Sequence, residues 1–201
     1  MCGIALGVWH HEDTQPHDAW ASVISQIQRR GRDAYHSVEC TQDGTRWELH
    51  ASVLCLRGKE LTPQPITSQD GHLHLAWNGQ IFSSEHEDDP LLDMERNDGA
   101  IIMTRLEEHA DQIPDVLVST LSAVDGPYAF VLVDTRNACI YYGRDPLGRR
   151  SLLHTTTQGA WHLASVSGAA WNAHWIDVDC DALWQVTWGP APGRIPRSTS
   201  R

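Results

Sequence analysis

The sequence predicts an α+β fold in which two mainly antiparallel β-sheets pack together and helices cover their outer faces. Three observations support this. Strand-like segments outnumber helical ones, and most connections between neighbouring strands are short turns, which favour antiparallel pairing. Several strands are apolar on both faces, as expected of strands buried between layers. The order of elements is strand, helix, strands, two helices and strands.

The first half of the chain contains one amphipathic helix among strands. Its apolar residues share one face, two arginines lie at its C-terminal end, and Gly31 ends it. The expected elements are a strand over 2–9, a helix over 19–30, strands over 36–41 and 46–56 separated by the turn Asp43-Gly44, and a strand over 72–77 followed by a turn at Asn78-Gly79.

The second half begins with an acidic loop over 85–95, after which Asn97 or Asp98 can cap a helix. Pro114 suits the first turn of the next helix. The expected elements are helices around 101–106 and 113–124, strands over 128–134 and 138–144, a turn over 145–148, and strands over 151–155, 161–166 and 183–188. We expect one domain over 2–188 and a disordered tail or linker over 189–201, because the tail has little apolar content.

Composition excludes several function classes. The chain has 201 residues, 41% of them hydrophobic, and a net charge of −11, so we expect neither nucleic acid nor an anionic membrane as its main partner. The longest apolar run, 128–133, is too short to span a membrane. Nothing at the N-terminus indicates secretion, and five cysteines without a C-x-x-C pair favour a reducing compartment. We therefore expect a cytoplasmic protein.

Metal binding is the first alternative to consider, because the chain has 12 histidines. The pairs His10-His11 and His72/His74 lack a third ligand at metal-binding spacing. The acidic segment 85–89 lacks the spaced oxygen ligands and the glycine of a calcium loop. We therefore predict no metal site, and we expect the scattered tryptophans to pack in the core.

The N-terminus is the most informative segment. Removal of Met1, which a small following residue allows, would place a thiol and a free α-amine on Cys2. An α-amine has a pKa of about 7.7–8.0, so it can accept the thiol proton near neutral pH. Cys2 is therefore a candidate nucleophile that carries its own base. The alternative is that Cys2 is an inert cysteine buried in the first strand.

Five further motifs accompany this start. Each is weak alone, because Asn-Gly and Asp-Pro-Leu-Gly are ordinary turn sequences. The set comprises Arg29-Arg-Gly-Arg-Asp33, Leu54-Cys-Leu-Arg-Gly58 with Gln64-Pro65, Trp77-Asn-Gly-Gln-Ile-Phe82, Asn97-Asp98 before a helix, and Gly126-Pro-Tyr-Ala-Phe130 leading to Tyr142-Gly-Arg-Asp-Pro-Leu-Gly-Arg-Arg-Ser-Leu152. In this order and spacing, from Cys2 to about Trp188, the chain resembles the glutaminase domain of class II glutamine amidotransferases, and within them the asparagine synthetase domain-containing proteins.

The resemblance implies a four-layer αββα N-terminal nucleophile fold and hydrolysis of glutamine to glutamate and ammonia. In such a domain Cys2 would attack the glutamine amide, and Asn78 and Gly79 would stabilise the oxyanion. The substrate would be bound by Arg57 at its carboxylate, by Asp98 at its ammonium, and by Gln80. Another motif, Arg30, Gly31 and Asp33, would shape the loop beside the nucleophile.

The resemblance also implies partners. The ammonia would serve asparagine-type amide synthesis in a synthetase module, present in cis or in trans. The chain has no Ser-Gly-Gly-x-Asp-Ser type pyrophosphate loop, so we expect no cofactor here, and ATP and magnesium only in that module. Two positions depart from the family pattern: Arg32 stands where proline is usual, and Gln80 where glutamate is usual. A non-catalytic interaction or regulatory module of the same fold therefore remains the alternative function.

Overall fold

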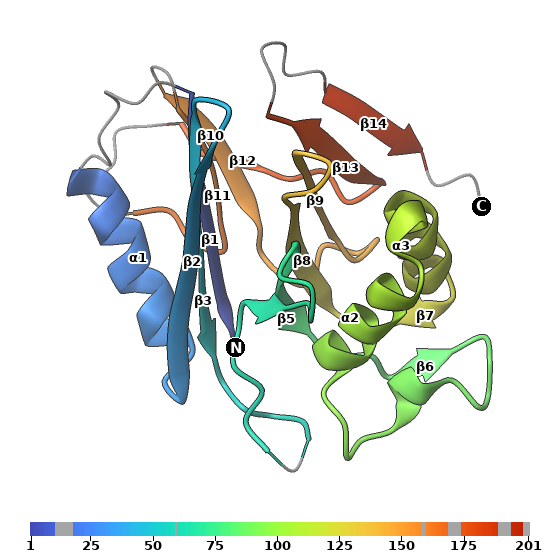
Figure 1. Cartoon of the computed structure of the whole chain (residues 1–201). Helices are drawn as coiled ribbons and strands as arrows, with labels where there is room; N and C mark the ends of the chain where they lie inside the picture. Colours follow the sequence, from blue (N-terminus) through green and yellow to red (C-terminus); the bar gives the residue numbers. More distant parts are fainter. Residues whose placement is uncertain (11–17, 59, 158–159, 169–173, 189–193, 199–201) are drawn as a thin grey trace.

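Figure 1 shows the chain as a computed structural model, which describes residues 1–10, 18–58, 60–157, 160–168, 174–188 and 194–198. The helices are α1 (Asp18–Arg30), α2 (Asp98–Glu108) and α3 (Ile113–Ser122). The longer strands are β1 (Gly3–Trp9), β2 (Ala34–Gln42), β3 (Thr45–Val53), β5 (Leu73–Gly79), β8 (Tyr128–Asp134), β9 (Cys139–Arg144), β10 (Leu153–Thr157), β11 (Ala160–Ala164), β13 (Ala182–Thr187) and β14 (Arg194–Ser198). Two-residue strands are β4 (Ile66–Thr67), β6 (Ser83–Ser84), β7 (Val124–Asp125) and β12 (Ile176–Asp177).

The described strands form two six-stranded antiparallel sheets. The first sheet has the order β12-β10-β11-β1-β3-β2, and the second has the order β14-β13-β9-β8-β5-β4. A separate pair, β6 and β7, lies beside the second sheet. The N-terminal strand β1 is an interior strand of the first sheet, paired with β3 and β11. The start of the chain is therefore fixed on both sides.

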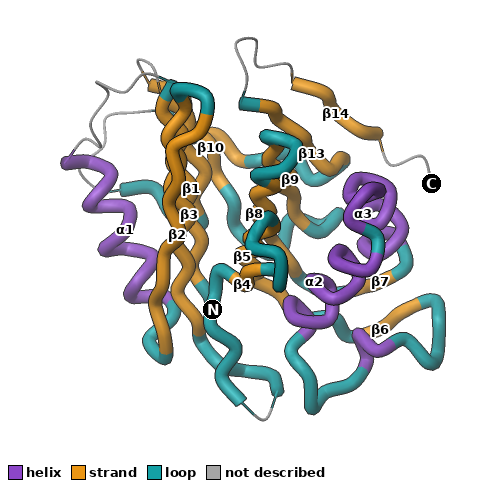
Figure 2. The backbone as a smooth tube through the Cα atoms, viewed as in Figure 1, coloured by secondary structure: helices purple, strands orange, loops and turns teal. Residues whose placement is uncertain are grey.

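The helices cover the outer faces of the two sheets, as Figures 1 and 2 show. Helix α1 packs on the first sheet, where Trp9, Trp20 and Val23 are buried in one apolar cluster. Helices α2 and α3 pack on the second sheet. Another apolar cluster lies between the sheets and contains residues from both, such as Leu6 and Val131. The predicted α+β fold with four αββα layers is confirmed.

Most predicted elements are present with small changes in their bounds. The turn at Asp43-Gly44 joins β2 to β3, and both residues adopt the positive φ angles of a tight hairpin turn, 51° and 72°. The acidic segment contains a short 3₁₀-helix, Pro90–Leu92, capped by the Asp89 side chain. A second one, Ala110–Gln112, precedes α3.

Two predictions were wrong. Asn78-Gly79 is not a turn: both residues continue β5 and pair with Ala129 and Tyr128 of β8, so ladder pairing overrides the local turn preference. The tail is not wholly disordered, since Arg194–Ser198 forms β14 on the edge of β13. Backbone pairing to an open edge needs no apolar content, which is why composition missed it. The rest of the tail, 189–193 and 199–201, lies outside the described residues.

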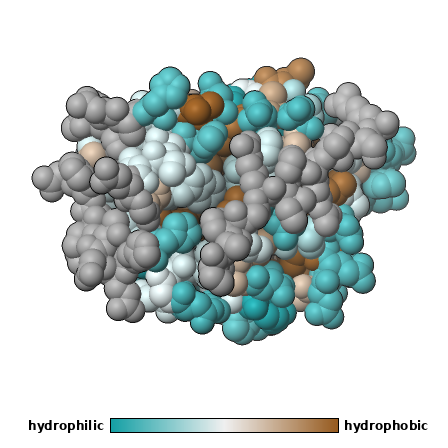
Figure 3. Space-filling view, turned by 90° about the horizontal axis from the view of Figure 1, so that it is seen from above, coloured by the Kyte–Doolittle hydropathy of each residue, from teal (hydrophilic) through white to brown (hydrophobic). Residues whose placement is uncertain are grey.

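The two ends of the sandwich differ. At the end of the sandwich where β1 ends, an apolar cavity of about 370 Å³ opens between the sheets, lined among others by Val8, Tyr142 and Trp161. Seen from above, that end shows small apolar patches among polar atoms (Figure 3). The N-terminus lies at the other end, beside a small polar cavity. Within the described residues, no helix has the length and apolar character needed to cross a membrane.

Candidate active site

The candidate nucleophile, Cys2, lies immediately before β1. Its Sγ approaches the backbone of Leu54, 3.7 Å from the carbonyl oxygen and 3.5 Å from the amide nitrogen. Burial raises the pKa of the Cys2 thiol, although the Leu54 hydrogen bond and nearby positive charges act in the opposite direction. The thiol therefore needs a base to become a nucleophile near neutral pH.

The C-terminal end of α1 and the loop after it hold the main chain around this cysteine. Arg30 donates from Nε to the Cys2 carbonyl oxygen (3.3 Å) and from Nη1 to that of Ser165 (3.4 Å). Gly31 is buried so closely against β3 that a Cβ there would lie 2.5 Å from the Val53 nitrogen. The next motif residue, Asp33, accepts a hydrogen bond from the Cys55 amide (2.7 Å). The predicted loop residues thus lie around the nucleophile, and Arg32 at the usual proline position is exposed.

Asn78 and Gly79 lie at the end of β5 and line the same cavity as Cys2. Asn78 is 2% exposed, and its Nδ2 has no hydrogen-bond partner among the described residues. A buried amide donor without a partner is rare and suggests that a ligand completes its bonding. A side chain at Gly79 would collide with Tyr128, with 2.7 Å between the two Cβ atoms.

The Gly79 N–H faces the open side of β5. Amide groups alternate between the two edges of a strand. The Gln80 N–H donates to Pro127 O toward β8 (3.0 Å), whereas the Trp77 N–H donates to Gln64 Oε1 on the other edge (2.7 Å). The Gly79 N–H shares that second edge with Trp77. Asn78 and Gly79 therefore offer two donors in one region.

The acidic group of the cavity is Asp98, the first residue of α2, where the Asn97 side chain accepts from Ala100 N and caps the helix. Asp98 is 1% exposed, and its Oδ2 accepts from Ile81 N (2.9 Å). Burial raises the pKa of the Asp98 carboxyl, against the effects of this bond and of the Arg57 charge. Gln80 lies on the cavity wall with Asp98.

Arg57 also lines this cavity. A guanidinium has five N–H donors. Nη1 donates to Ile81 O (2.8 Å) and approaches Asp98 Oδ2 (3.5 Å), and Nη2 donates to the carbonyl oxygens of Leu91 (2.5 Å) and Asp93 (3.0 Å). Only Nε lacks a partner among the described residues. The assignment of the substrate carboxylate to Arg57 stays a prediction, and this geometry gives its fork a structural role.

The Cys2 cavity, as we call the space that these side chains line, has a volume of about 30 Å³ with Met1 in place. That is room for roughly one water molecule. Met1 itself forms part of the lining, so its removal enlarges the cavity. Burial lowers the pKa of the N-terminal amine, and the nearby Arg30 and Arg150 charges add to this shift.

Sequence reasoning did not assign several of the residues that line this cavity to the site. Arg150 and Thr62 line it together with the predicted residues, although neither was singled out for the site. The signal for Arg150 was its place in the Gly-Arg-Asp-x-x-Gly-Arg-Arg motif, which the sequence analysis used only for recognition. In the described part of the chain, no three His, Cys, Asp or Glu residues cluster as metal ligands would.

A four-layer sandwich with a cysteine at the start of an interior strand, next to buried amide donors, defines the class of N-terminal nucleophile amidotransferases. The family model described as glutamine amidotransferase domain matches residues 1–188. The chain belongs to the glutamine amidotransferase domain family.

Curated relatives give a narrower likeness. The chain is 31% identical over 190 residues to asparagine synthetase domain-containing protein 1 of Bos taurus, covering 92% of this chain and 28% of the relative. It is 31% identical over 156 residues to asparagine synthetase [glutamine-hydrolyzing] 1 of Saccharomyces cerevisiae, covering 76% of this chain and 25% of the relative. The chain thus spans about a quarter of the length of these proteins.

Solved structures share the fold. The allosteric regulatory enzyme of purine biosynthesis matches with a TM-score of 0.69 at 18% identity, covering 98% of this chain and 49% of that chain. Glutamine phosphoribosylpyrophosphate amidotransferase from B. subtilis matches with a TM-score of 0.60 at 16% identity, with the same coverage. These likenesses confirm the N-terminal nucleophile type of fold.

Proposed function

We propose that this chain hydrolyses glutamine to glutamate and ammonia, with Cys2 as its nucleophile. The observation that carries the proposal is the meeting of the half-buried Cys2 thiol and an amide donor without a described partner, Asn78 Nδ2, in one cavity. Membership of the amidotransferase family and the likeness to a glutamine-hydrolysing synthetase support it.

The chemistry begins with removal of Met1, which exposes the Cys2 α-amine. This amine accepts the thiol proton, and the thiolate attacks the side-chain carbonyl carbon of glutamine. Asn78 Nδ2 and the Gly79 N–H donate to the oxyanion that forms. The intermediate collapses as the amine returns the proton to the leaving nitrogen, which departs as ammonia. Water then attacks the γ-glutamyl thioester and releases glutamate and the free thiol.

The remaining polar residues would bind the amino-acid end of the substrate. Asp98 Oδ2 accepts from Ile81 N, and the Asp98 carboxylate lines the cavity, where it can face the substrate ammonium. Gln80 offers a neutral carbonyl acceptor beside it. Three further residues would act indirectly, because they form hydrogen bonds to, or pack against, the backbone of Cys2 and its neighbours. They are Arg30, Gly31 and Asp33.

The use of the ammonia follows from the relatives. We propose that it serves asparagine-type amide synthesis in a synthetase module, in cis or in trans, because the relatives carry asparagine synthetase in their names and are longer than this chain. ATP and magnesium would act in that module, so this domain needs no cofactor for hydrolysis. The alternative, a non-catalytic regulatory module, predicts no turnover at all.

The deciding experiment compares chains with a free and a blocked Cys2 amine. Intact mass first establishes that Met1 is removed, and release of glutamate is then measured with and without ATP. We expect hydrolysis that ATP does not change, and its complete loss in Cys2→Ala and in a chain with an N-terminal extension. Full activity in the extended chain would contradict the self-activating nucleophile.

A further inference from the structure

The direction of the Gly79 N–H matters, because the proposed chemistry uses it as an oxyanion donor. A backbone donor can point only where its strand directs it. In β5 the N–H groups of Trp77 and Gly79 face the same edge, the one toward β4. On the opposite edge, Gly79 pairs with Tyr128 of β8. The position of this donor therefore depends on what lies along the β4 edge.

The backbone ladder along that edge stops before the site. The last pair of β4 and β5 on the side of the Cys2 cavity is Ile66 with Leu75. The same register, continued along the chain, would place Thr62 opposite Gly79, where the Thr62 carbonyl oxygen could accept from the Gly79 N–H. Thr62 instead lines the Cys2 cavity, and the described residues provide no backbone acceptor for the Gly79 N–H. This donor is thus available to a ligand.

One side chain fills the gap between the ladder and the open donor. Gln64 is 2% exposed, and its Oε1 accepts from Trp77 N (2.7 Å). The register of β4 and β5 places Gln64 opposite Trp77, so its side-chain carbonyl takes the place that a backbone carbonyl would have in a longer β4. Figure 2 shows β4 beside β5. The edge is therefore covered as far as Trp77 and open at Gly79.

Trp77 passes its position on to Gly79 through packing. A Cβ on Gly79 would lie 2.8 Å from Trp77 Cζ2, so the indole ring lies directly against the Gly79 backbone. The ring also stacks on Tyr128, with 5.3 Å between the ring centroids and 17° between the planes. Trp77 is buried, and close packing leaves it little room to move alone. A shift of Trp77 would therefore displace the Gly79 N–H as well.

We infer that Gln64 is a positioning residue whose Oε1 holds the edge of β5 so that the Gly79 N–H faces the oxyanion; this inference rests on the proposed function. Gln64 acts through Trp77. The oxyanion is absent from bound glutamine and forms only during the reaction, so loss of Gln64 should lower kcat and leave KM nearly unchanged. If β8 alone fixes Gly79, the same bond contributes to stability and not to kcat.

The test removes the acceptor and compares the two ends of one strand edge. Gln64→Met keeps the length of the side chain but loses the carbonyl acceptor, whereas Gln64→Glu keeps an acceptor oxygen. The matched control is Ser68→Ala, because buried Ser68 Oγ accepts from Leu73 N (2.9 Å) at the other end of β5. We expect kcat for glutamine to fall about 10- to 100-fold in Gln64→Met, with KM within about threefold of the wild type. Gln64→Glu should recover most of this loss, and Ser68→Ala should keep the wild-type kcat.

Amide hydrogen exchange supplies a measurement that does not depend on activity. The Trp77 N–H should exchange faster in Gln64→Met than in the wild type and slow again in Gln64→Glu. The Leu73 N–H should respond to Ser68→Ala alone. If Gln64→Met does not fold, Gln64→Asn takes its place, because its shorter side chain withdraws the carbonyl from Trp77 N.

Three results would contradict the inference. Unchanged Trp77 exchange in Gln64→Met, unchanged kcat in that variant, or an equal fall of kcat in Ser68→Ala would each overturn it, while hydrolysis by the wild-type chain upheld the proposed function. Absence of hydrolysis by the wild-type chain would refute the proposed function and the role of Gln64 together.

Discussion

Two clusters of polar side chains in this molecule contain similar groups. They differ in whether their donors have hydrogen-bond partners within the described residues. Under α1, Glu48 Oε2 accepts from Trp20 Nε1 (3.2 Å) and pairs with His50 Nε2 (3.1 Å). Tyr35 then bonds the other nitrogen of His50 (2.8 Å), and Arg46 bonds Glu48 Oε1 (2.5 Å). In the Cys2 cavity, by contrast, Asn78 Nδ2, Arg57 Nε and Arg150 Nε have no partners among the described residues.

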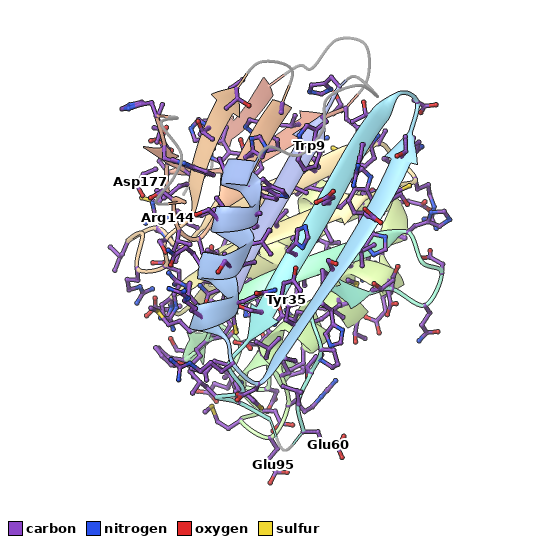
Figure 4. All side chains as sticks on the ribbon, turned by 90° about the vertical axis from the view of Figure 1, so that its left-hand side faces the viewer. Trp9, Tyr35, Glu60, Glu95, Arg144 and Asp177 are labelled. Carbon is purple, nitrogen blue, oxygen red and sulfur yellow. The ribbon has the colours of Figure 1, made fainter. Side chains whose placement is uncertain are left out.

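The difference teaches where a function can reside. Each buried donor without a partner costs roughly 1–3 kcal/mol, so a group of such donors beside a thiol is a candidate ligand site. The Glu48 cluster stabilises the contact between α1 and the first sheet, which Figure 4 views with Trp9 and Tyr35 labelled. Substitutions in the two clusters should therefore change different quantities.

The largest expected effect is that of Asn78→Ala. Loss of one oxyanion donor should lower kcat for glutamine about 10²- to 10³-fold. The free energy of unfolding should change by no more than about 1 kcal/mol, because Nδ2 has no described bond to lose. Chemical denaturation and steady-state kinetics on the same preparation check both. A large loss of stability with unchanged kcat would show that Asn78 has a structural role. The contrast between the Glu48 cluster and the Cys2 cavity would then not hold.

The second prediction concerns acid stability near the Glu48 cluster. Burial lowers the pKa of His162 to about 4, and its ring lies 5.0 Å from that of Trp20. Because the unfolded histidine, with a pKa near 6.5, binds the proton first, this stability is present above about pH 6.5 and is lost as the pH falls to about 4. The loss should be about 3 kcal/mol.

Unfolding free energies measured across this window in the wild type and in His162→Leu isolate the contribution. We expect the variant to have the shallower pH dependence and the exposed His36→Leu to behave as the wild type. Glutamine hydrolysis at pH 7.5 should be unaffected in both. Parallel pH curves for the wild type and His162→Leu would show that another group carries the acid sensitivity.

The smallest expected effect is that of Gln80→Glu. A glutamate would add a negative charge beside Asp98, near the proposed position of the substrate ammonium. A charged hydrogen bond exceeds a neutral one by about 1 kcal/mol, so KM for glutamine should fall several-fold with a smaller change in kcat. Steady-state kinetics decide: a raised or unchanged KM with intact folding would mean that Gln80 does not face the ammonium.

Local patterns predicted much of the fold and the location of the site. For several features, a few neighbouring residues are enough to predict the structure. These features are the apolar start of the chain, the amphipathic faces of α1, α2 and α3, and the Asp43-Gly44 turn. Cys2, Asn78 and Asp98 were recognised from motifs, and the structure brings all three to one cavity. Their roles stay proposals.

What the sequence did not reveal depends on tertiary pairing. Whether Asn78-Gly79 turns or continues a strand is decided by β8, which lies fifty residues later along the chain. The hydrogen bonds of Arg57 are decided by backbone carbonyl groups at 81, 91 and 93, which no side-chain pattern reports. Similarly, β14 forms because β13 offers an open edge.

The interior position of β1 ties the nucleophile to the order in which the chain is synthesised. One neighbour, β3, is available early, whereas β11 leaves the ribosome much later. Until β11 pairs with it, one edge of β1 is open. Ser165 also holds the start of β1 in place. Its hydroxyl accepts a hydrogen bond from Ile4 N (3.1 Å), and its carbonyl oxygen accepts one from Arg30. Closure of the first sheet around β1 therefore has to wait until residues 160–165 have been synthesised, long after the candidate nucleophile at the start of the chain.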